Sequence, residues 1–316
     1  MKRYHISFFF LFSFMFCLST SATNKTTDHL TEARSRIEQG MLALYEYRLH
    51  DADMLSAGLI KVFPQLSAVR LLRAHYYWTL IIGGFNTAEN RTHIFEELKS
   101  AEDYLKKKEN SNRSEDLFAE ISIKVMKARV HGLQGSQFRA FSELHSAVGE
   151  VKSSFGKEVD FPYFKLSTGL YLFYRSYARE RYPFTAPYLM LLPAGNMEKG
   201  LKLLEEGFRS EDPYLSCESG YFLIKIMIDK KDYLSALDKA SALYYKYPNN
   251  LIFAYLTLQM ANKNGQAELA RKIYKKVLLI SPSEAGYLPG QKEYFIVKMK
   301  EVLEERNTSS DEKSRN

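Results

Sequence analysis

An internal repeat of 34 residues constrains the fold of this chain more than any other feature of its sequence. The segment Cys217–Asn250 aligns without a gap on the segment Leu251–Glu284. The copies share an aromatic residue, a small residue and a closing proline, which pair as Tyr221 with Tyr255, Ala236 with Ala270, and Pro248 with Pro282. A unit of this length buries its apolar surface only against its neighbours, so the repeat predicts a stacked array.

The spacing of apolar residues indicates that each copy is a pair of helices. Between residues 232 and 247, apolar side chains recur three and four positions apart, which places them on one helix face. These residues are Tyr233, Ala236, Leu237, Ala240, Leu243, Tyr244 and Tyr247. A small residue such as Ala236 lets neighbouring helices approach to about 8–10 Å. The proline after the second helix prevents its continuation and starts the next pair.

These positions resemble the tetratricopeptide repeat (TPR) family, whose repeat has a polar turn, a small residue on the second helix and a closing proline. The matching residues are Asp232, Tyr233, Ala236 and Pro248 in one copy, and Gly265, Ala270, Tyr274 and Pro282 in the other. The Trp and Gly of the family's first helix are replaced by Gly220 and Ile224, and then by Ala254 and Leu258. The resemblance is clear over residues 217–284 and diffuse upstream. It implies an α-solenoid that holds ligands on the concave surface formed by the first helices.

Helical periodicity continues upstream with looser spacing, and we expect about six hairpins in all. The predicted pairs are 30–49 with 52–63, 66–82 with 92–107, 115–131 with 137–154, and 163–182 with 197–208. Residues 293–303 predict a closing helix, and the polar residues 304–316 predict a disordered tail. No segment alternates β-branched residues as a strand would. The predicted fold class is therefore all-α, an α-solenoid over residues 23–303.

The first 22 residues have the pattern of a signal peptide. Lys2 and Arg3 precede an apolar run from Ile6 to Leu18, and small residues follow it. As a helix this run is about 20 Å long, short of the roughly 30 Å hydrocarbon layer of a membrane. Phe16 disfavours lipid attachment at Cys17, because a small residue is expected there. We therefore expect an exported protein, periplasmic or secreted, with no transmembrane segment in the mature chain.

The sequence contains no recognised catalytic or metal-binding motif. None of the seven histidines has a second histidine or a cysteine at the spacing of a metal site, and His93 with Glu96 comes closest. The net charge of +7 is mild for this length and does not call for a nucleic-acid partner. We expect no cofactor, no metal and no catalytic residue. A hydrolase or lyase whose residues converge from distant hairpins remains a third alternative.

Two regions supply candidates for a partner-binding surface. Aromatic and arginine residues, which are enriched at protein-binding hot spots, concentrate between Tyr163 and Tyr188. The candidates there are Tyr174, Arg175, Arg181 and Tyr188, and the alternative is that such side chains pack between hairpins. On the expected concave face of the two clear repeats the candidates are Tyr221, Lys225, Tyr255, Gln259 and Lys263. The long apolar connection Pro183–Asn196 is either a further binding element or a cap over a gap in the solenoid.

The sequence therefore favours an exported, non-enzymatic protein that binds another polypeptide in the cell envelope, as a scaffold or assembly factor. The alternative from a different class is a periplasmic small-molecule carrier, or an accessory component of a solute-uptake system. That alternative requires an enclosed apolar pocket with a few polar groups. An enzyme would instead require Glu, Asp or His residues that converge in one cleft.

Overall fold

The computed structural model describes residues 21–107, 113–181, 190 and 192–313, and every regular element in these segments is a helix. The helices are α1 (Ser21–Tyr45), α2 (Leu49–Val62), α3 (Ser67–Ile82), α4 (Ala88–Lys107), α5 (Arg113–Leu133), α6 (Gln137–Ser146), α7 (Val148–Ser154), α8 (Phe164–Arg181), α10 (Met197–Phe208), α11 (Pro213–Asp229), α12 (Tyr233–Lys246), α13 (Leu251–Lys263), α14 (Ala267–Leu279), α15 (Pro282–Ala285) and α16 (Gln291–Lys313). Within these segments they pack as six hairpins, α1 with α2, α3 with α4, α5 with α6, α8 with α10, α11 with α12, and α13 with α14. The predicted all-α solenoid of helical hairpins with a closing helix is confirmed.

The sequence repeat corresponds to the hairpins α11–α12 and α13–α14. Their first helices begin at polar caps, since Asp212 accepts a hydrogen bond from the Leu215 amide and Asn250 accepts one from the Phe253 amide. The turns between helices also correspond, because each contains a residue in the left-handed region. Gly265 has a φ of 79° without strain, whereas Lys231 has a φ of 60° at the equivalent position.

Several helix boundaries differ from the sequence prediction, and the first helix is observed over Ser21–Tyr45 instead of 30–49. The helix expected over 137–154 is interrupted at Ala147, which ends α6 and precedes α7. The short helix α15 follows the closing Pro282, which suits a first helical position. Helix α16 runs to Lys313, past the predicted end at Leu303 and into the segment expected to be a disordered tail. That segment contains neither proline nor glycine to end a helix before Lys313.

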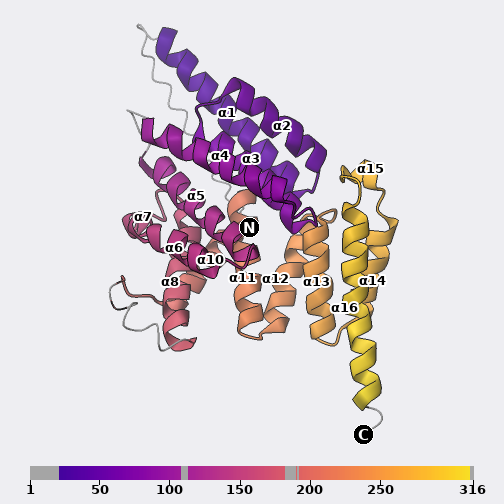
Figure 1. The fold of residues 1–316 in the computed structure, drawn as a ribbon. Helices are drawn as coiled ribbons and strands as arrows, with labels where there is room; N and C mark the ends of the chain where they lie inside the picture. Colours follow the sequence, from indigo (N-terminus) through magenta and orange to yellow (C-terminus); the bar gives the residue numbers. More distant parts are fainter. Residues whose placement is uncertain (1–20, 108–112, 182–189, 191, 314–316) are drawn as a thin grey trace, which may run out of the picture.

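The solenoid closes on itself, because its first and last hairpins share a hydrophobic core. Figure 1 shows α1–α4 lying obliquely above the upright helices α11–α16. The Asn250 side chain donates to the Tyr45 carbonyl at 2.9 Å, and the Tyr47 ring packs edge-on against Tyr287 at 5.6 Å. The common core includes Leu49, Leu258 and Met299. In an open solenoid each repeat contacts only its neighbours, so this shared core is a long-range contact that stacking alone would not provide.

Helices α8 and α10 approach each other closely at Gly169 and Gly200. A Cβ atom added at Gly200 would lie 2.6 Å from the backbone nitrogen of Phe173 and 2.7 Å from the Gly169 carbonyl oxygen. Because backbone atoms cannot rotate away, we predict that Gly200→Ala lowers the free energy of unfolding by about 1–3 kcal/mol. Chemical denaturation measures this change. Gly58→Ala is the matched control, because nothing lies within 4 Å of its added Cβ. It should stabilise helix α2 by about 1 kcal/mol, and a stabilising Gly200→Ala would contradict the close packing.

Candidate functional site

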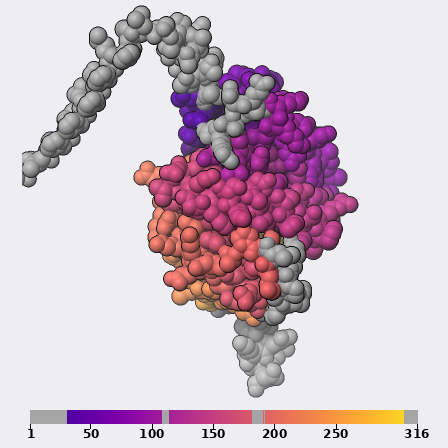
Figure 2. Space-filling view, turned by 90° about the vertical axis from the view of Figure 1, so that its left-hand side faces the viewer, coloured from indigo at the N-terminus to yellow at the C-terminus, as the bar shows by residue number. Residues whose placement is uncertain are grey.

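A cavity of about 560 Å³ lies among helices α5, α6, α7, α8 and α11. Figure 2 shows the molecule from this side, where α5–α7 form a band above α8–α11. The lining is mostly apolar and includes Phe118, Val125, Val148, Leu166, Leu170 and Phe222. Protein interiors are normally packed without voids much larger than a water molecule, so this cavity is a specific feature of the fold.

Two long helices form much of the cavity lining, because each presents one of its faces to the cavity. Helix α5 presents Ile121, Val125 and Ala128, which are three and four positions apart. Helix α8 presents Leu170, Tyr174 and Ala178, which are each four positions apart. The outer wall is α6, which has no buried residue and, among the described helices, contacts mainly α5 and to a smaller extent α7.

A buried ion pair forms part of the cavity wall. Arg129 of α5 donates to Glu218 of α11 at 2.6 Å, and their side chains are only 14% and 11% exposed. The guanidinium lies 4.6 Å from the ring centre of Phe222 and 5.6 Å from that of Trp78. The Tyr45 hydroxyl donates to the other carboxylate oxygen of Glu218 at 3.4 Å. The pair also borders a smaller cavity of about 50 Å³, so it separates two hollow regions.

The groups around this ion pair are neutral. Burial lowers the pKa of His75 to about 4, and its ring packs edge-on against Tyr214 at 5.5 Å. Burial also raises the pKa of Tyr214. Burial alone would raise the pKa of Glu218, but the charge and hydrogen bond of Arg129 hold it below its ordinary value. General acid–base catalysis works best with a pKa near the working pH, and none of these three groups has one.

Three of the predicted site residues lie at the two cavities. Tyr174 and Arg175 of α8 line the large cavity, and Tyr221 of α11 lines the smaller one. Burial raises the pKa of both tyrosines. The neighbouring Phe173 is 1% exposed and belongs to the core, as the packing alternative expects.

Among the remaining candidates, none of the described side chains lines either cavity. The Tyr255 ring packs against Phe295 of α16 at 6.1 Å, and Gln259 is half-buried on α13. Helix α13 contacts α12, α14 and α16. Lys225 and Lys263 are exposed. Arg181 ends α8, and its side chain and Tyr188 lie outside the described part of the chain.

The connection from residue 183 to residue 196 is described only at residue 190 and from residue 192 onward. Met190 is exposed, and Leu192 lines the large cavity. The rest of the predicted apolar element lies outside the described residues.

The sequence interpretation missed Arg129, Glu218 and His75. One signal was available, because Glu218 is the only acidic residue between Tyr214 and Ile228, on a helix that is otherwise largely apolar. A buried carboxylate requires a partner, so its position predicts a cation nearby. The identity of that cation is not evident from the sequence, because Arg129 lies 89 residues away.

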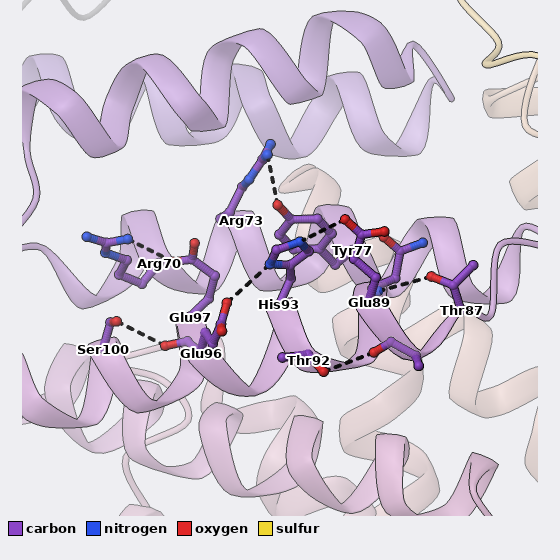
Figure 3. A network of polar contacts seen from close by, with 12 residues as sticks. Arg70, Arg73, Tyr77, Thr87, Glu89, Thr92, His93, Glu96, Glu97 and Ser100 are labelled. Atoms are coloured by element: carbon purple, nitrogen blue, oxygen red, sulfur yellow. Dashed lines mark hydrogen bonds and ion pairs between the residues drawn. The ribbon is translucent and has the colours of Figure 1, made fainter.

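A second polar network joins α3 to α4 (Figure 3). The His93 ring stacks on Tyr77 at 4.9 Å and contacts Glu96 at 3.2 Å, and the Tyr77 hydroxyl accepts from Arg73 at 3.0 Å. Arg70 donates to Glu97 at 2.9 Å. Over the part of the chain with described positions, no group of three His, Cys, Asp or Glu side chains is arranged to hold a metal ion. The Arg70–Glu97 and Tyr77–His93 contacts connect the two helices.

Comparison with protein-family models, with curated proteins and with solved structures finds no match to this chain. Among the described helices, none combines the length and apolar composition needed to cross a membrane. The proposed function therefore rests on the geometry of the cavity.

Proposed function

We propose that this protein is a non-enzymatic, TPR-like carrier that binds a small, largely apolar molecule in the large cavity. The observation that supports this is a partly open cavity of about 560 Å³ that is lined by mostly apolar side chains from several helices. Sites for small molecules typically measure about 300–1,000 Å³ and combine an apolar lining with a few polar groups. The cavity meets both requirements, so the geometry favours the carrier alternative over the polypeptide-binding function.

The backbone of a polypeptide suits this cavity poorly. Every peptide residue brings an N–H and a C=O group that need partners. Most of the lining consists of groups such as Val125, Leu166 and Leu170, which cannot form hydrogen bonds. Each unsatisfied backbone group would cost about 1–3 kcal/mol. A hydrocarbon ligand has no such requirement.

A polypeptide partner in the cell envelope is the second candidate, and helix α6 favours it. Phe138 is 83% exposed, and Phe141 and Leu144 are about half exposed beside it. Clustered exposed apolar side chains often mark interaction sites. Such a partner would contact the outer wall of the cavity rather than its interior.

The proposed location is an exported compartment, periplasmic or secreted. Its support is the basic and apolar pattern from Lys2 to Leu18, which lies outside the described residues. The TPR-like assignment is supported by the correspondence of the two repeats with two consecutive hairpins.

Filling the cavity should abolish binding of an apolar probe. We predict that Leu170→Trp weakens binding of the neutral fluorophore phenylnaphthylamine at least tenfold, a loss of about 1.4 kcal/mol or more. Fluorescence titration measures the affinity. Met54→Trp is the matched control, because it adds the same ring at a position 59% exposed on α2. If the wild type and both variants bind the probe equally, the cavity is not the binding site.

A further inference from the structure

A buried histidine lies where the large cavity and the smaller one adjoin. His75 of α3 lines both cavities, and it is only 8% exposed. Its ring packs edge-on against Tyr214, and neither ring nitrogen forms a hydrogen bond with another described residue. A neutral imidazole has one nitrogen that donates and one that accepts. His75 therefore offers a hydrogen-bond donor and an acceptor to a molecule in the large cavity.

The charges around His75 favour an uncharged ligand group. Arg129 and Glu218 also line both cavities, and they compensate each other at 2.6 Å. Burial keeps the His75 ring neutral, because it lowers the pKa of the imidazole to about 4. A charged ligand group would lose its hydration here without gaining an opposite charge, which costs far more than burying a neutral hydroxyl.

The exposure of the lining residues gives the ligand a direction. Phe141 and Leu144 of α6 line the large cavity at 50% and 49% exposure, whereas His75 and Glu218 are 8% and 9% exposed. The hydrogen-bonding ring of His75 thus lies at a buried end of the cavity. A ligand that binds it extends its apolar part along the lining toward α6.

We propose that the ligand is an uncharged amphiphile whose hydroxyl group hydrogen-bonds the His75 imidazole, with its apolar part along the lining of the large cavity. This inference rests on the proposed function and specifies its ligand class. A hydroxyl both donates and accepts, as a neutral imidazole does, so the two groups match. A site that hydrogen-bonds a ligand hydroxyl rejects an analogue that lacks it, because the buried polar group then has no partner.

Four competitors that share a ten-carbon chain test the ligand class. Decanol, decyl methyl ether, decanoate and decyltrimethylammonium each compete with phenylnaphthylamine for the full chain at neutral pH. We expect decanol to displace the probe at a concentration at least tenfold lower than either ion. The ether cannot donate a hydrogen bond, so the expected advantage of decanol over it is about fivefold, the equivalent of one hydrogen bond.

Variants of His75 test the assignment to this residue. His75→Phe removes the hydrogen-bonding nitrogens and keeps a ring, so it should abolish the preference for decanol over the ether and leave the affinity for phenylnaphthylamine nearly unchanged. His75→Gln supplies a donor and an acceptor again, and should restore part of the preference. His145→Phe is the matched control and should keep the preference, because His145 lines the same cavity from α6 at an exposed position.

A measurement on the wild type does not depend on how the variants fold. The imidazole nitrogen resonances of His75 in the nuclear magnetic resonance spectrum should shift when decanol is added, and those of His93 should not. Unchanged His75 resonances at saturating decanol would overturn the assignment to this residue, as would a preference for decanol that survives His75→Phe.

The outcomes separate the ligand class from the carrier function. If either ion displaces the probe as well as decanol does, or if decanol does not displace it, the uncharged hydroxyl class is wrong. The carrier function then still stands, provided that Leu170→Trp weakens binding of the probe. If no competitor displaces the probe and Leu170→Trp still binds it, both proposals fail.

Discussion

Replacing Glu218 by alanine should lower the free energy of unfolding by about 3–5 kcal/mol. The substitution leaves the Arg129 guanidinium buried without its charged partner, against the faces of Phe222 and Trp78. Arginine cannot escape this cost by losing its proton, because its pKa lies far above neutral pH. Urea denaturation at neutral pH measures the loss.

Two comparisons show whether the loss comes from the unpaired charge. Glu115→Ala breaks the Arg34–Glu115 pair, whose side chains are 61% and 41% exposed, and should cost less than about 1 kcal/mol. The double variant Arg129→Met with Glu218→Met replaces the buried pair by apolar side chains. It should recover most of the stability lost in Glu218→Ala, because no buried charge remains. A loss of less than about 1 kcal/mol for Glu218→Ala alone would contradict the buried ion pair.

Lowering the pH from 7 to 4 should remove about 3 kcal/mol of stability through His75 alone. Burial lowers the pKa of this imidazole from 6.5 to about 4 in the folded protein. Between these two values the unfolded chain binds a proton that the folded protein does not bind. Stability therefore decreases as the pH falls through this window, at up to about 1.4 kcal/mol per pH unit, and is constant with respect to this group above about pH 7.

Denaturation at a series of pH values isolates this effect. His75→Gln removes the titrating group, so the difference in stability between wild type and variant should shrink as the pH falls from 7 to 4. His93→Gln is the control, because it removes a histidine from the partly exposed α3–α4 network. Parallel pH profiles for the wild type and His75→Gln would show that His75 is not buried as described.

The helices were predictable because the forces that form them are local. Apolar spacing along the chain, the polar caps and the closing prolines all act within one or two turns of helix. The structure accordingly starts α12 at Tyr233 and α14 at Ala267, which preserves the offset of the sequence repeat. The interruption at Ala147 carries no such signal, since alanine is a strong helix former.

The candidate site was predictable only in part because it forms between distant segments. The concentration of aromatic and arginine residues pointed to Tyr174 and Arg175, which both line the cavity. The Arg129–Glu218 pair joins α5 to α11, and no local pattern links them. The packing of α16 against α13, beside Tyr255, also depends on the path of the whole chain.

Hydrogen exchange with and without phenylnaphthylamine tests the central claim most directly, because it locates the ligand on the chain. If the cavity holds the ligand, saturating phenylnaphthylamine should slow amide exchange in the segments 118–129 and 166–178, on α5 and α8. Exchange in α13 and α14 should stay unchanged, which makes the two clear repeats an internal control. Slower exchange confined to α13–α16, or no change in any segment at saturation, would contradict the assignment of the cavity as the binding site.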